Sequence, residues 1–72
     1  MSNYYVVNNN ATLNPGFHHE VHTMEHANFL GIRSFIRLGA FSDEIAAVNF
    51  AKAYYYPDAD GCAICCPNAH EG

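Results

Sequence analysis

Positive charge is scarce in this sequence. Only three of the 72 residues are lysine or arginine, against seven aspartates and glutamates, so the formal net charge is -4. The three cations, Arg33, Arg37 and Lys52, do not form a run. A surface that binds nucleic acid needs clustered cations to neutralise phosphates. We therefore expect neither DNA nor RNA as a partner.

The sequence also lacks a long apolar run. No stretch approaches the ~18 apolar residues that a membrane-spanning helix needs. Residues 1–5 contain no basic segment followed by an apolar one, which a secretory signal would require. These features predict a cytoplasmic protein with no membrane partner.

Motifs of several enzyme classes are missing as well. The five glycines are scattered, so there is no glycine-rich loop for phosphate. None of the serines lies in the Gly-x-Ser-x-Gly context of a nucleophile elbow. The run from His22 to His26 matches the letters of an inverted zinc peptidase motif, but so short a chain hardly provides the third ligand and the substrate cleft. The sequence therefore does not identify an enzyme.

Apolar residues, in contrast, are plentiful. They make up half of the chain, which is well above the fraction in disordered proteins. We expect residues 1–72 to form a single small domain, because this length leaves room for one core only. Such a core supplies about 3 to 5 kcal/mol of net stability, so small domains often add a metal, a disulfide or a second subunit.

Residue patterns predict three strands in the first half of the chain. Residues 4–7 are aromatic and β-branched, and residues 17–23 and 35–40 alternate in polarity. The Asn-Pro-Gly turn at 14–16 predicts a hairpin between the first two strands. Gly39 predicts a bulge in the third strand.

A helix is predicted over residues 43–55. Ser42 can cap its first turn, and Pro57 stops it. Residues 62–66 then predict a last short strand. The fold class is therefore α+β, in the order β-β-β-α-β, with a small antiparallel sheet of three to four strands packed on one helix. The expected core-facing residues of the helix are Ala47, Val48, Phe50, Ala51, Tyr54 and Tyr55, with Asn49, Lys52 and Tyr56 facing solvent.

The three cysteines all lie near the C-terminus, at positions 62, 65 and 66. A disulfide framework spreads an even number of cysteines along the chain, and the adjacent Cys65 and Cys66 cannot reach normal bridge geometry without strain. We therefore expect reduced thiols.

Two pairs of residues have the spacing of metal ligands. The pairs His22-x-x-x-His26 and Cys62-x-x-Cys65 supply the nitrogen and sulfur atoms that tetrahedral zinc prefers. The intervening domain would bring the pairs together, so His22, His26, Cys62 and Cys65 are the predicted zinc ligands. If the last segment is a strand, alternation turns Cys66 to the opposite face.

Other uses of these residues stay open. Cys66 and His70 are alternative ligands, which with Cys62 or Cys65 would form a set within the tail. The histidines, His18 and His19 included, could instead be exposed residues, and the thiols small buried hydrophobes, with no metal bound. Redox chemistry is less favoured, because activated thiolates usually lie at a helix N-terminus.

Taken together, five motifs resemble an uncharacterised family of small bacterial proteins, which implies a fold and no activity. They are Tyr4-Tyr5-Val6-Val7-Asn8, His19-Glu20-Val21-His22, Leu38-Gly39-x-Phe41, Ala47-Val48-x-x-Ala51-Lys52, and Asp58 through Gly61-Cys62-x-x-Cys65 with Pro67 and His70. The family pattern has a cysteine at two further positions. At the first this chain has His26, which can still bind a metal, and at the second it has Ala69, which cannot.

A more distant resemblance concerns the order of the parts. An upstream ligand pair, a helix after Phe-Ser and a closing Cys-x-x-Cys followed by proline are similar to the zinc domain of the bacterial DNA-methylation repair protein, where four cysteines hold zinc. The resemblance implies zinc in a site with two histidines. It does not imply methyl transfer, because the nucleophilic cysteine of the upstream pair has no counterpart here.

Three hypotheses for function follow. The first is a binding domain with a structural zinc ion. The second is a metal-free interaction protein that binds an unknown protein partner or forms a homodimer through Tyr54, Tyr55 and Tyr56. The third is a thiol- or metal-dependent enzyme. Coordination separates the first from the third, since four protein ligands close a zinc site and three leave a position open.

Overall fold

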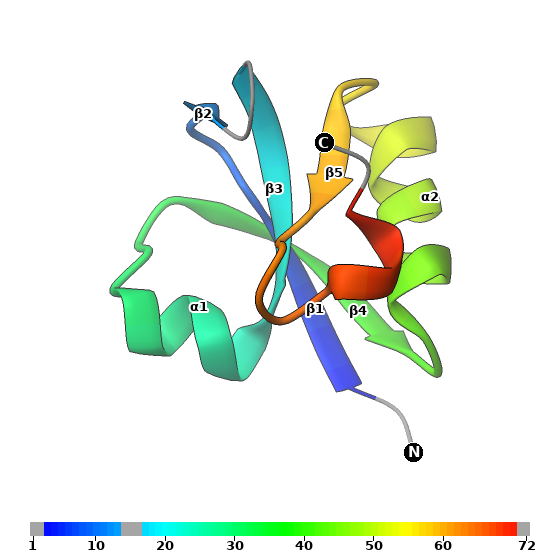
Figure 1. Cartoon of the computed structure of the whole chain (residues 1–72), viewed down its shortest axis with the longest axis horizontal. Coiled ribbons are helices and arrows are strands. Elements are labelled where there is room, and N and C mark those ends of the chain that lie inside the picture. Colours follow the sequence, from blue (N-terminus) through cyan, green and yellow to red (C-terminus); the bar gives the residue numbers. More distant parts are fainter. Residues whose placement is uncertain (1–2, 14–16, 71–72) are drawn as a thin grey trace.

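The computed structural model describes residues 3–13 and 17–70, and the predicted turn at 14–16 lies outside them. Figure 1 shows a sheet with helices on both of its sides. The fold class α+β is thus confirmed. The strands are β1 (Asn3–Asn8), β2 (Thr12–Leu13), β3 (Phe17–Thr23), β4 (Phe35–Phe41) and β5 (Ala59–Gly61), and the helices are α1 (Met24–Leu30), α2 (Glu44–Tyr54) and the short 3-10 helix η1 (Pro67–Ala69).

Strand β3 lies inside the sheet and pairs with three other strands. It runs antiparallel to β1, where Val6 faces His22, and antiparallel to the short β2. Its other edge pairs with β5 in parallel, with Val21 beside Gly61. Strand β1 also pairs with β4 in the antiparallel sense. The sheet is therefore mixed, whereas the sequence predicted an antiparallel one.

The predicted bulge at Gly39 is present. Tyr5 pairs with Gly39 but Val6 pairs with Arg37, so β4 contributes one extra residue, Leu38, at this point. Gly39 has a φ of 109°, a conformation that residues with a side chain rarely adopt.

The hydrophobic core lies between the sheet and α2, which we call the α2 side of the sheet. Side chains of β1, β3 and β4 meet three small residues of the helix, which let the backbones approach closely. The buried core residues are Tyr5, Val7, Val21, Leu38, Ala47, Val48, Ala51, Ala59, Cys66 and Ala69. Because side chains alternate along a strand, the intervening residues Val6 and His22 point to the other face, which carries α1 and is called the α1 side.

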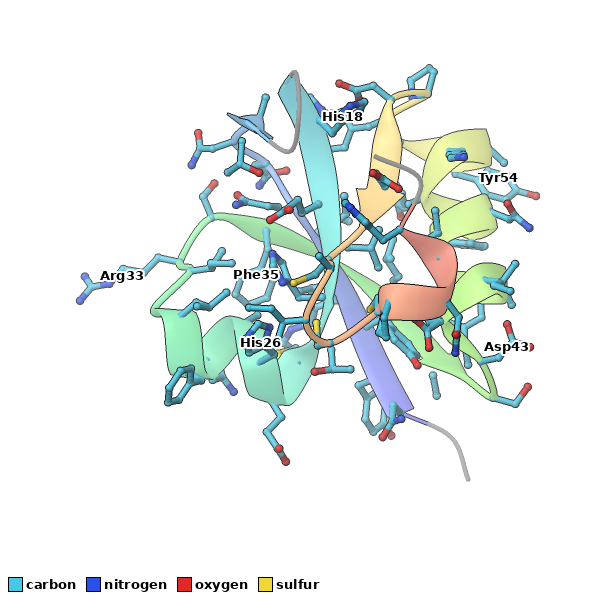
Figure 2. All side chains as sticks on the ribbon, viewed as in Figure 1. His18, His26, Arg33, Phe35, Asp43 and Tyr54 are labelled. Carbon is cyan, nitrogen blue, oxygen red and sulfur yellow. The ribbon has the colours of Figure 1, made fainter. Side chains whose placement is uncertain are left out.

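The tyrosines at the end of α2 do not follow the prediction. Tyr54 is 71% exposed, and its ring packs on that of Phe50 with centroids 4.7 Å apart, so it covers the edge of the core instead of filling it (Figure 2). Tyr55 is also exposed. Tyr56, expected to face solvent, is half-buried. Its ring stacks on that of His19, with the ring centroids 3.8 Å apart. Because α2 ends at Tyr54, the helical period does not determine which way the side chains of Tyr55 and Tyr56 point.

Two local predictions at the helix and the last strand were wrong. Asp43, not Ser42, is the N-cap of α2, because its extended backbone lets the carboxylate accept from the amide of Ala46 at 2.8 Å. Residues 62–66 form a turn and not a strand, since the amide of Cys66 donates to the carbonyl of Cys62 at 2.8 Å. The strand precedes this turn, at Ala59–Gly61.

Helix α1 was not predicted. Thr23 caps it by accepting from the amide of His26 at 3.2 Å, and Gly31, with a φ of 74°, ends it. Only Ala27 is buried within it. Neither this helix nor any other in the described ranges is long and apolar enough to cross a membrane.

Candidate metal centre

Four side chains converge on the α1 side of the sheet. His22, His26, Cys62 and Cys65 each offer one ligand atom, and these atoms all lie within 4.8 Å of one another. They are the four residues that the sequence pattern predicted as ligands. The structure thus brings together a His2Cys2 cluster that could hold a metal ion.

The two histidines come from the junction of β3 and α1. His22 lies near the end of the strand and is only 1% exposed. The chain then turns at the Thr23 cap, which places His26 in the first turn of the helix with its ring centroid 5.6 Å from that of His22. In Figure 2 the His26 side chain lies between α1 and the loop that follows β5.

The two cysteines come from the turn that follows β5. The amide of Cys62 donates to the carbonyl of Val21 at 3.0 Å, which continues the pairing with β3 and fixes the start of the turn. The backbone amides of Cys65 and Ile64 hydrogen-bond the sulfur of Cys62. A turn of this kind directs Cys62 and Cys65 to the same point.

Two distances within the cluster are close to those of tetrahedral coordination. The Sγ of Cys62 lies 3.8 Å from Nδ1 of His26, and the Sγ of Cys65 lies 3.8 Å from Nδ1 of His22. Zinc bonds near 2.3 Å to sulfur and 2.05 Å to nitrogen would put a tetrahedral pair about 3.6 Å apart. These two sulfur–nitrogen distances would shorten by only about 0.2 Å on zinc binding, and all other pairs of ligand atoms lie within 4.8 Å.

The surroundings act in opposite directions on the two thiols. Burial raises the pKa of Cys62, although the amide hydrogen bonds from the turn partly offset it. The hydrogen bond with Cys66 lowers the pKa of Cys65, and hydrogen bonds with His22, the Thr23 backbone and His26 lower it further. The pKa of Cys66 is raised, mainly because its proton is held against Cys65. The cluster thus favours a thiolate at Cys65, which is the form that binds metals.

The carboxylate of Glu20 lies next to the imidazole ring of His22. The Nε2 atom of His22 is buried and has no hydrogen-bond partner, while Oε1 of Glu20 lies 3.5 Å away. The two atoms are close, but they lack the alignment of a hydrogen bond. If Nδ1 binds a metal, Nε2 carries the proton and points toward this carboxylate, an arrangement typical of metal-binding histidines. Sequence reasoning did not assign this role, although residues two apart on a strand share a face.

The other candidate residues lie elsewhere. His18 and His19 contact Asp58, the latter through a 2.7 Å pairing of its Nδ1 with the carboxylate. His70 Nδ1 lies 3.0 Å from the carbonyl of Gly61. The alternative ligand Cys66 is buried in the core on the α2 side, with its sulfur 3.8 Å from that of Cys65.

No protein-family model, curated protein or solved structure matches this chain.

Proposed function

We propose that the chain is a small binding domain whose His22, His26, Cys62 and Cys65 hold one structural zinc ion. One observation carries the proposal: four ligand atoms from β3, α1 and the turn after β5 lie within 4.8 Å of one another. Two thiolates and two imidazoles in a tetrahedron form a set that favours zinc over calcium or magnesium, which prefer oxygen. Because all four positions are filled by protein, the site is closed and structural.

The distribution of the core explains why a metal would matter here. The apolar core lies on the α2 side, and α1 buries only Ala27. A helix of seven residues is unstable without tertiary contacts, and one small buried side chain supplies little. A metal bound to His26 would fasten α1 to β3 and to the cysteine turn, in the place of apolar packing.

The partner of such a domain stays a prediction from the sequence, namely an unknown protein or a second copy of the chain. Exposed tyrosines at the end of α2 are compatible with such contacts. An enzyme is the less favoured alternative, because a closed site leaves no position for water or substrate on the metal.

Metal analysis of the protein purified without a histidine tag tests the proposal. We expect one zinc ion per chain, and a Co²⁺ form with the intense sulfur-to-metal absorption of a tetrahedral thiolate site. Protein that contains no zinc, takes up none from buffer and shows no Co²⁺ absorption would contradict the proposal.

A second prediction concerns the carboxylate behind His22. Glu20→Gln should lower zinc affinity about tenfold or more, because the amide holds the imidazole proton less strongly than a carboxylate does. Competition with a chromophoric chelator measures this. Glu25→Gln is the matched control, since it makes the same charge change on exposed α1. An equal loss in both variants would show that only general electrostatics act at the site.

A further inference from the structure

The α1 side of the sheet is only partly covered. Helix α1 packs against β1 and β3, and beside it a cleft of about 520 Å³ opens over β1 and β4. This volume is in the range of small-molecule sites. Met24 and Asn28, which line the cleft, are four residues apart and therefore lie on one face of α1. His26 is two residues from each of them, which places it on the opposite face. The cleft and the metal cluster are thus at different faces of the helix.

The walls of the cleft are aromatic and apolar. Tyr4 of β1, Phe35 of β4 and Met24 of α1 line it. Tyr4 is 68% exposed, so most of its surface is open to solvent beside the cleft. Aromatic and thioether side chains in such an arrangement favour a flat, unsaturated ring.

One cation stands at the β4 end of the cleft. Arg37 pairs with Val6 across the strands, so it points to the α1 side and not into the core. It is exposed, and the described part of the chain supplies no ion pair or hydrogen bond to its guanidinium. The chain has a net charge of -4 and only three lysines and arginines, so Arg37 is the cation among the residues that line this cleft.

We propose that this cleft binds a small aromatic carboxylate, with the acid group on Arg37 and the ring between Tyr4 and Met24. A guanidinium offers two parallel N–H donors that match the two oxygens of a carboxylate. The opposite orientation would place the acid group toward an adjoining hollow that shares Tyr4 and Met24 with the cleft. It is disfavoured, because the acidic residue Glu25 is among those that line this hollow. The cleft shares no side chain with the proposed zinc ligands, but α1 contributes Met24 and Asn28 to it. The zinc content of the protein is therefore measured before each titration, so that a failure of the metal site is distinguished from a failure of the cleft.

Titration of the ¹⁵N-labelled protein with naphthalene-2-carboxylate tests the inference. We expect saturable amide shifts at β1, β4 and α1 with a Kd below about 10 mM. Naphthalene-2-carboxamide, which keeps the ring without the charge, and acetate, which keeps the charge without the ring, should each bind about tenfold more weakly or worse. Equal binding of the carboxamide, or no saturable shift with the carboxylate, would overturn the proposal.

A pair of arginine variants localises the charge effect. Arg37→Met should weaken binding of the carboxylate about tenfold or more and leave binding of the carboxamide unchanged. Arg33→Met is the matched control, because Arg33 projects away from the domain and does not line the cleft (Figure 2). Both positions are exposed, so both variants should keep the amide spectrum of a folded protein. Equal weakening by the two variants would overturn the assignment of Arg37.

Discussion

Cys65→Ser should abolish stoichiometric zinc binding and lower the melting temperature by at least about 15 °C. Structural zinc sites have apparent binding free energies of about 10 to 16 kcal/mol, whereas a core of this size supplies about 3 to 5 kcal/mol. Each kcal/mol shifts the melting temperature of such a domain by about 4 to 8 °C. A loss of only 3 kcal/mol therefore accounts for the expected change, which circular dichroism measures. Cys62→Ser should behave alike, because its sulfur lies in the same cluster.

Cys66→Ala is the control for this result. Cys66 is fully buried in the core and neighbours Cys65, but it is not a member of the cluster. Its loss leaves a small cavity and lowers stability modestly, while zinc content should stay at one ion per chain. A chelator should lower the melting temperature of Cys66→Ala as it does for the wild type, and should have no further effect on Cys65→Ser. Equal zinc loss in all three cysteine variants would contradict the assignment of ligands.

The main strands could be predicted from the sequence because their side chains alternate in burial. Val7 and Val21 enter the core, while the neighbouring Val6 and His22 face the other side. Strand β5 could not be recognised in this way. It has three residues, Ala59–Gly61, with a composition typical of a turn, and only its pairing with β3 makes it a strand.

Helix α1 was missed for a related reason. The alternating pattern of β3 runs without a break into the helix, and a helix of seven residues with one buried side chain has almost no apolar period to detect. Its end signals were present in the sequence. Thr23 can cap a helix, and Gly31 can end one.

The members of the cluster could be predicted from ligand spacing, although the reasons differ from those expected. His22 and His26 come together because strand β3 is followed directly by helix α1 at Thr23, and this helix was not predicted. The side chains of Cys65 and Cys66 point to opposite sides of the sheet, as expected. They do so because they lie in a turn, and not because they alternate along a strand. The contact between Glu20 and His22 needed the structure, since spacing alone does not show which ring atom faces a carboxylate.

Gly61→Ala should destabilise the domain strongly, because the chain after the cysteine turn returns to lie directly against β5. A Cβ at this position would be 2.7 Å from the carbonyl oxygen of Cys66 and 2.9 Å from the carbonyl carbon of Ala69. Both are backbone atoms, so no side-chain rotation relieves the clash. Overpacking of this kind costs about 1 to 3 kcal/mol, and the fixed neighbours place Gly61 at the upper end, with a fall in melting temperature of about 10 °C or more.

Gly31→Ala provides a comparison of the opposite kind. Its Cβ would meet nothing within 4 Å, but its φ of 74° strains any side chain, at a cost of about 1 to 2 kcal/mol. Thermal unfolding of both variants with saturating zinc should therefore show the larger loss for Gly61→Ala. The same clash would displace the turn that begins at Cys62, so zinc affinity should fall in Gly61→Ala and stay unchanged in Gly31→Ala. A Gly61→Ala protein as stable as the wild type would mean that residues 66–69 do not pack against β5, and that the turn holding the two cysteines is positioned in another way.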